Sequence, residues 1–136
     1  MQKGFNLLIA DRNPHIREFL KREMEAEGYN IQLAKNGREV LRLVYGSEPV
    51  DLIIIDLDLP DASELNLFKS LEDCIPTLPI IVHSYLSDNF ESSKSLKPVI
   101  FVQKQGNSSE TLKDVVLNFL REPYSKKFKT PEDWKK

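Results

Sequence analysis

Residues 51–60 read Asp51-Leu52-Ile53-Ile54-Ile55-Asp56-Leu57-Asp58-Leu59-Pro60. The four residues from Leu52 to Ile55 are all apolar, and no polar residue alternates with them. A continuous branched run of this kind is typical of a parallel β-strand that helices cover on both faces. We therefore predict a buried central strand here, and the strands beside it should be parallel too.

The rest of the chain alternates between apolar runs and segments with helical spacing. We predict the other four strands at 5–10, 29–33, 79–82 and 99–102. Strands that alternate with helices indicate parallel pairing with right-handed crossovers. The sequence therefore predicts an α/β fold, a doubly wound five-stranded parallel sheet of flavodoxin-like order 2-1-3-4-5 in a three-layer sandwich.

The helical segments differ in how clearly they are marked. Asn13-Pro14 begins the first one, because proline at the first helical position has no N–H to leave unbonded. We predict further helices near 65–73 and at 107–121, whereas the polar segment 88–95 should form a short helix or none.

Length and composition favour a single domain. The chain has 136 residues, of which 40% are hydrophobic, with a net charge of -2 and one cysteine. We place the domain at 1–122 and a loosely held, lysine-rich tail at 123–136. One cysteine excludes a disulfide within the chain, and no apolar run spans a bilayer, so we expect a cytoplasmic protein that binds neither membrane nor nucleic acid directly.

Polar residues follow or end four of the predicted strands, and these are Asp11, Asp56, Ser84 and Lys104. Ligands of doubly wound sheets bind at the carboxyl ends of the strands, so we expect these side chains to lie together. Two carboxylates can hold a divalent cation that screens a phosphoryl group, and a lysine and a hydroxyl can bind its oxygens. The pattern indicates a phosphoryl-acceptor site.

The chain resembles the response regulator receiver family of two-component signalling over about residues 4–121, in the single-domain form found in chemotaxis. The resemblance lies in four stretches: Leu7-Leu8-Ile9-Ala10-Asp11, Asp51 to Pro60, Ile80-Ile81-Val82-His83-Ser84, and Phe101-Val102-Gln103-Lys104.

This resemblance implies a role for each matching residue. Asp56 would accept a phosphoryl group from a histidine of a sensor kinase or phosphotransfer protein, with Lys104 and Ser84 on the phosphate. Mg²⁺ would be held by Asp11, Asp56 and the backbone carbonyl of Asp58. Ser84 and Phe101 would be the switch residues, and a second copy of the chain could bind the face of helix 4, strand 5 and helix 5. The output protein stays unknown.

Four residues depart from the family pattern. Arg12 replaces a second metal-binding acid, so we expect weak Mg²⁺ binding, with Arg12 either exposed or paired with Asp56 or Asp58. Glu64 stands in place of glycine, which predicts a different or strained loop. Tyr85 replaces a small residue and should partly cover the acceptor, and Gln105 replaces a proline, so the bond after Lys104 should be trans.

Three alternatives remain open from the sequence. A pseudo-receiver would keep the fold but take no phosphate, because Arg12 replaces the acid. Asp56-Leu57-Asp58 also resembles the start of a haloacid-dehalogenase phosphatase, but the later acidic pair of those enzymes is missing, so we expect no enzyme. Nucleotide or flavin binding lacks a phosphate-cradling loop after the first strand.

Overall fold

Five strands form one parallel sheet with the order β2-β1-β3-β4-β5, which confirms the predicted topology. The computed structural model describes residues 4–61, 66–74, 78–85 and 99–121. Within it the strands are β1 (Asn6–Ala10), β2 (Asn30–Ala34), β3 (Leu52–Ile55), β4 (Ile80–Ser84) and β5 (Val99–Gln103).

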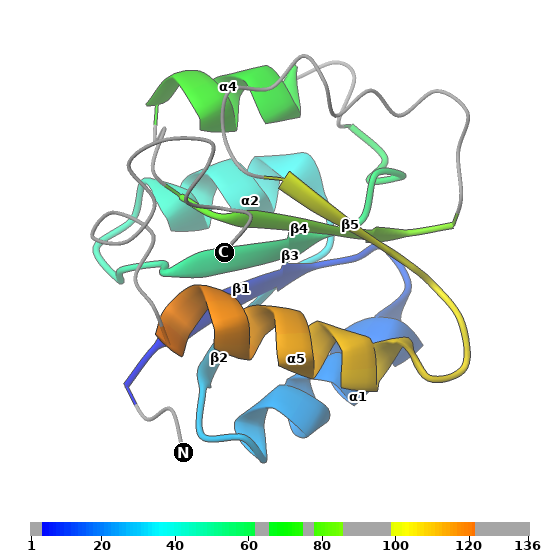
Figure 1. The fold of residues 1–136 in the computed structure, drawn as a ribbon. Coiled ribbons are helices and arrows are strands. Elements are labelled where there is room, and N and C mark those ends of the chain that lie inside the picture. Colours follow the sequence, from blue (N-terminus) through cyan, green and yellow to red (C-terminus); the bar gives the residue numbers. More distant parts are fainter. Residues whose placement is uncertain (1–3, 62–65, 75–77, 86–98, 122–136) are drawn as a thin grey trace, which may run out of the picture.

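Four helices cover the two faces of the sheet in the described part of the chain (Figure 1). One face carries α1 (Pro14–Glu25) and α5 (Ser108–Arg121), and the other carries α2 (Gly37–Val44) and α4 (Leu67–Cys74). The predicted helices at 65–73 and 107–121 are confirmed as α4 and α5. The predictions for segment 88–95 and for the tail at 123–136 lie outside the described residues.

Helix α1 begins as its sequence predicts. The side chain of Asn13 accepts hydrogen bonds from the backbone N–H groups of His15 and Ile16, and Pro14 is the first helical residue. Two N–H groups that have no partner within the helix are thereby bonded. The chain leaves the helix at Gly28, whose φ of 99° favours glycine.

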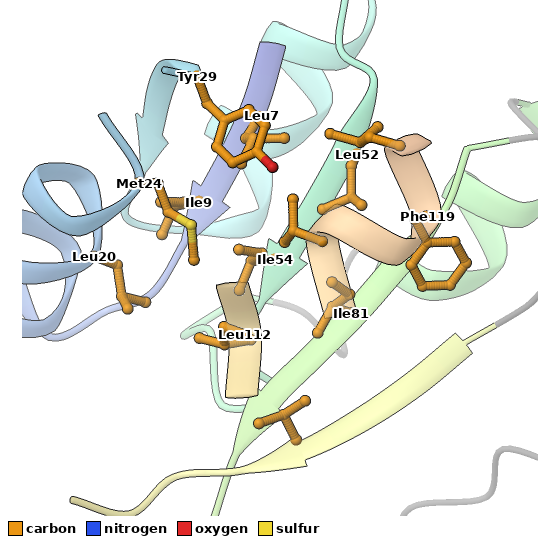
Figure 2. Packing of buried hydrophobic residues seen from close by; sticks show 13 residues of the cluster. Leu7, Ile9, Leu20, Met24, Tyr29, Leu52, Ile54, Ile81, Leu112 and Phe119 are labelled. Carbon is orange, nitrogen blue, oxygen red and sulfur yellow. The ribbon is translucent and has the colours of Figure 1, made fainter. Parts of the chain in front are cut away.

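The core consists of two layers, one on each face of the sheet. Figure 2 shows the layer between the sheet and α1 and α5, in which Leu20 and Met24 meet strand residues such as Ile54. The second layer packs Ile53 and Ile55 toward α2 and α4. Alternate residues of β3 therefore belong to opposite layers, and the continuous apolar run follows from burial on both faces.

Strand register determines which strand ends lie together. Ala10 is paired with Ile55, so the residues that follow them, Asp11 and Asp56, leave neighbouring strands at the same level. Ser84 is paired with Gln103, the residue before Lys104. No helix in the described part of the chain is long and apolar enough to cross a membrane.

Candidate functional site

Four polar side chains lie at the carboxyl edge of the sheet. Asp11 and Asp56 directly follow β1 and β3, Ser84 ends β4, and Lys104 directly follows β5. Their exposed fractions are only 2%, 3%, 1% and 9%. Residues tens of positions apart in the sequence therefore share one buried site, as expected where parallel strands end together.

The ammonium group of Lys104 joins the two carboxylates. Its Nζ lies 2.9 Å from Asp11 Oδ2 and 3.0 Å from Asp56 Oδ2. The other oxygen of Asp56, Oδ1, accepts a hydrogen bond of 2.9 Å from Ser84 Oγ and one of 3.0 Å from the backbone N–H of Asp58. Both oxygens of Asp56 thus have donors, which hold the carboxylate in one orientation.

The environment moves the pKa values of the two carboxyl groups in opposite directions. Burial raises the pKa of Asp11, and the nearby charge of Asp56 adds to this, against hydrogen bonds from Lys104 and the backbone N–H of Asn13. Burial also acts to raise the pKa of Asp56, but donors from Asp58, Lys104 and Ser84 outweigh it and lower this pKa. Of these two carboxylates, Asp56 is therefore the one that its surroundings hold in the charged form.

Lys104 is the matching cation. Burial acts to lower its pKa, but the hydrogen bonds and charges of Asp11 and Asp56 outweigh burial, so its pKa is raised. A buried lysine that keeps its charge between two acids can bind the oxygens of an incoming anion.

Arg12 is exposed, and it forms no ion pair with any residue that the structure describes. The pairing with Asp56 or Asp58 that the sequence left open does not form. Lys104 already lies between the carboxylates of Asp11 and Asp56, and the guanidinium of Arg12 stays in solvent outside the site.

Arg17 contacts the site in a way that the sequence did not predict. Its Nη1 donates a hydrogen bond of 2.7 Å to the backbone carbonyl of Asp11. Asn13 binds the same residue from the other side, with its backbone N–H donating 2.9 Å to Asp11 Oδ1. The sequence does contain a signal for this contact, because Arg17 lies one helical turn after the cap residue Asn13 and is therefore near the end of β1.

The ring of Tyr85 lies near the ammonium group of Lys104. Its ring centroid is 5.3 Å from Lys104 Nζ, and 62% of the residue is exposed. This is the distance of a cation–π contact. The bond between Lys104 and Gln105 is trans, as expected, since the described residues contain no cis peptide bond.

Phe101 and Glu64 are the two remaining residues that the resemblance to the receiver family singled out. Phe101 is half-buried and packs against the core layer on the side of α2 and α4. Glu64 lies outside the described residues. Asn66, two positions later, has a φ of 50°, in the left-handed region that is uncommon for a residue other than glycine.

A pocket of about 340 Å³ lies next to Lys104. Its lining includes Phe19 of α1, Tyr85, and His83 of β4. His83 is 3% exposed, and its Nε2 lies 2.9 Å from the Oγ of Ser108 at the start of α5. No pattern in the sequence indicated the contact between His83 and Ser108.

The donor set can be tested against a divalent cation. Asp11 Oδ2 and Asp56 Oδ2 both face the position of Lys104 Nζ, which lies 2.9 Å from the first oxygen and 3.0 Å from the second. Mg²⁺ is commonly bound through one or two carboxylates together with phosphate and water, so these residues fit it. A third protein carboxylate is missing, and the described residues contain no group of three or more His, Cys, Asp or Glu that could hold a metal.

Comparison with known families identifies this arrangement. Residues 7–116 match the model of the response regulator receiver domain. The chain belongs to the response regulator receiver family. The match covers the five strands except Asn6 at the start of β1, the four described helices except the end of α5, and all four side chains of the site.

Receiver-containing proteins of several kinds are similar to this receiver. The DNA-binding transcriptional regulator NtrC of Proteus hauseri is 33% identical over 88 residues, covering 65% of this chain and 18% of that protein. Response regulator MprA of Mycolicibacterium vanbaalenii is 33% identical over 76 residues, covering 56% and 32%. The sensor kinase/phosphatase CqsS of Vibrio cholerae is 32% identical over 119 residues, covering 82% and 16%. The chain thus spans less than half of each of these relatives.

Solved receiver structures are also similar to it. A chain in the crystal structure of histidine kinase ThkA in complex with response regulator TrrA is 32% identical, with a TM-score of 0.73, covering 85% of this chain and 98% of that one. TrrA of Thermotoga maritima in complex with Mg²⁺-BeF is 31% identical, with a TM-score of 0.70, covering 82% and 96%. A CheY-like receiver from Methanospirillum hungatei, 22% identical with a TM-score of 0.73, covers 86% and 94% and shares the fold.

Proposed function

We propose that this chain is a phosphoacceptor receiver of a two-component phosphorelay, which takes a phosphoryl group on Asp56. The observation that carries the proposal is the pair of contacts to Asp56, with Lys104 on one carboxylate oxygen and Ser84 on the other. These groups are the donors that a phosphoryl group on this carboxylate requires.

The chemistry follows from the charges. A carboxylate oxygen of Asp56 would attack the phosphorus of a phosphohistidine while the phosphorus–nitrogen bond breaks, and the leaving imidazole would take a proton from solvent. The lowered pKa of Asp56 keeps the attacking group ionised at neutral pH. Lys104 and Ser84 would then move from the carboxylate to the oxygens of the phosphoryl group, at little cost because both already point there.

Asp11 and Asp56, with the backbone carbonyl of Asp58, would hold Mg²⁺ at this site. The ion would supply positive charge against the phosphoryl oxygens. We propose weak binding, because Lys104 competes for the two carboxylates and Arg12 adds a positive charge where the family pattern has an acid.

The proposed phosphoryl donor is a sensor histidine kinase or a phosphotransfer protein in the cytoplasm, in line with the histidine kinase bound to the similar regulator TrrA. Phosphorylation adds charge of about -1.5 to -2, to which Ser84 and Phe101 would respond and so alter a partner-binding face. An unknown output protein, or a second copy bound through α4, β5 and α5, would read that face. We assign this function to residues 1–122, with 123–136 as a tail, and propose no direct contact with nucleic acid or membrane.

Intact mass after incubation with acetyl phosphate and Mg²⁺ tests the acceptor. Wild type should gain one phosphoryl group, Asp56→Asn none, and Asp58→Asn one, because the side chain of Asp58 is exposed and Lys104 pairs with Asp11 and Asp56 instead. Labelling that survives Asp56→Asn would show that the acceptor is another residue.

One observation favours a second candidate, a pseudo-receiver. Lys104 already forms an ion pair with both carboxylates, and Arg12 is not an acid, so the fold can stand without metal or phosphate. Wild type that stays unlabelled while circular dichroism shows an intact fold would support this candidate. We propose no enzyme activity, and turnover of phosphate esters would instead indicate the haloacid-dehalogenase alternative.

A further inference from the structure

Two buried polar side chains meet beside the acceptor site on the face of the sheet that α1 and α5 cover. His83 is 3% exposed and Ser108 is 7% exposed, and His83 Nε2 lies 2.9 Å from Ser108 Oγ. Ile81, two residues before His83 on the same face, packs in the apolar layer. Two apolar side chains could fill this space without the cost of burying polar groups. The presence of a hydrogen-bonded pair here therefore indicates a role other than packing.

The pair closes a ring of contacts around the connection from β5 to α5. His83 is joined through the chain to Ser84, whose carbonyl accepts a hydrogen bond of 2.9 Å from the backbone N–H of Lys104. Lys104 leads to Gln105, whose carbonyl accepts a hydrogen bond of 3.0 Å from the N–H of Ser108. The contact between Ser108 and His83 completes the ring, which contains both residues whose side chains bind Asp56.

Other restraints on this connection are few. Gly106 has open space around the position of a Cβ atom, with nothing within 4 Å. Residues 105–107 are exposed, and the trans bond before Gln105 lacks a proline ring that would restrict it. The side-chain contact of Ser108 therefore ties the start of α5 to the end of β4.

The imidazole is suited to this task because it stays neutral. Burial lowers its pKa to about 4, and the charge of Lys104 acts in the same direction. A neutral ring can share one hydrogen bond with a hydroxyl through Nε2, and His83 Nδ1 has no hydrogen-bond partner among the described residues. Its contact with Ser108 is thus the hydrogen bond that orients the ring.

We propose that His83 and Ser108 are a positioning pair, which holds the β5–α5 connection against β4 and so keeps Lys104 Nζ between Asp11 and Asp56. The pair touches neither carboxylate and acts through Lys104. The inference rests on the proposed function, since it names the residues that preorganise the acceptor site.

Removal and rescue variants separate this role from simple packing. Ser108→Ala and His83→Leu remove the hydrogen bond, whereas Ser108→Thr keeps the hydroxyl and His83→Gln keeps a polar atom near the position of Nε2. The double variant His83→Leu/Ser108→Ala leaves no unpaired polar group, so it covers the case in which a single variant fails to fold. Ser109→Ala is the matched control, because Ser109 is 8% exposed and makes no side-chain hydrogen bond with described residues.

Two measurements are made on each folded variant. The first is the nitrogen-15 NMR signal of the Lys104 ammonium and its hydrogen exchange, which needs no phosphorylation. The second is the initial rate of labelling by acetyl phosphate with Mg²⁺. Removal variants should exchange the ammonium protons faster and be labelled roughly tenfold more slowly. Rescue variants and Ser109→Ala should stay near wild type in both.

The outcomes are distinct. An unchanged Lys104 signal and an unchanged labelling rate in Ser108→Ala or in the double variant would overturn the inference, as would an equal loss in Ser109→Ala. If wild type takes no phosphate, the proposed function fails, and the Lys104 signal alone decides whether His83 and Ser108 position the lysine.

Discussion

Arg12 directly follows Asp11 and is exposed at the start of α1. Replacing it with aspartate changes the local charge by two units and restores the acid of the family pattern. We expect Arg12→Asp to raise the affinity for Mg²⁺ roughly tenfold, measured by calorimetric titration. Arg42→Asp makes the same charge change on α2, where 72% of the arginine side chain is exposed, and should leave the affinity near wild type. Equal affinities for wild type and Arg12→Asp would mean that the charge at this position does not reach the site.

His83 makes stability depend on pH in a defined direction. Its pKa in the folded protein is lowered to about 4 from 6.5, so the folded state binds fewer protons than the unfolded state between these values. The stabilisation is fully present above pH 6.5 and is lost as the pH falls toward 4. The loss should be on the order of 3 kcal/mol, opposed in part by Asp11, whose pKa is raised.

Urea unfolding at pH 7, 5.5 and 4.5 measures this effect. His83→Gln should show a smaller fall of the unfolding free energy over this range, while His15→Gln, at an exposed histidine, should keep the wild-type fall. A fall of the same size in all three proteins would mean that other groups cause it.

The four site residues could be predicted from the sequence because each stands at a strand end, and parallel strands of one sheet share an edge. Ser108 could not, because its contact with His83 depends on how α5 approaches the sheet. Asp61 is a similar case, since its carboxylate accepts hydrogen bonds from the backbone N–H groups of Gly37 and Arg38 at the start of α2. The distance between these segments in space is not contained in any local pattern.

At the scale of elements, α1 offers two adjacent apolar residues with different burial. Leu20 is 2% exposed and packs in the layer with Met24, whereas Phe19 is 41% exposed and has Arg22 over its ring at 5.6 Å. Leu20→Ala should lower the free energy of unfolding by about 2–5 kcal/mol, because it removes a buried side chain and leaves a cavity. Phe19→Ala should cost much less, as its side chain keeps contact with water.

Chemical denaturation of both variants compares them directly. Similar losses would show that the outer side of α1 is as well packed as the inner side. The predicted bounds of the strands and of α4 and α5 agree with the structure to within two residues, since apolar runs and caps are local signals. The register of the strands, which sets Asp11 beside Asp56, could be stated only from the structure.

At the scale of the whole molecule, the acceptor site joins the ends of β1, β3, β4 and β5, and these strands contribute about half of the buried residues of each core layer. A ligand bound at this site therefore contacts elements that would separate on unfolding. Any ligand that binds only the folded state stabilises it by an amount set by its concentration relative to its dissociation constant. The strands of one parallel sheet all have their carboxyl ends at the same edge. The sequence could therefore predict the topology, and a ligand at that edge contacts several strands at once.

Beryllium fluoride with Mg²⁺ is a phosphoryl analogue that tests this coupling, as in the similar receiver TrrA, which was crystallised with Mg²⁺-BeF. At ten times the dissociation constant it should stabilise wild type by about 1.4 kcal/mol, which raises the melting temperature by roughly 4 °C for a domain of this size. Asp56→Asn should show no rise, because the analogue needs the carboxylate oxygen that it bonds, whereas Asp58→Asn should show the wild-type rise. A rise that persists in Asp56→Asn would place the bound analogue elsewhere, and no rise in wild type, with Mg²⁺ shown to bind, would mean that Lys104 does not leave the two carboxylates for a phosphoryl group.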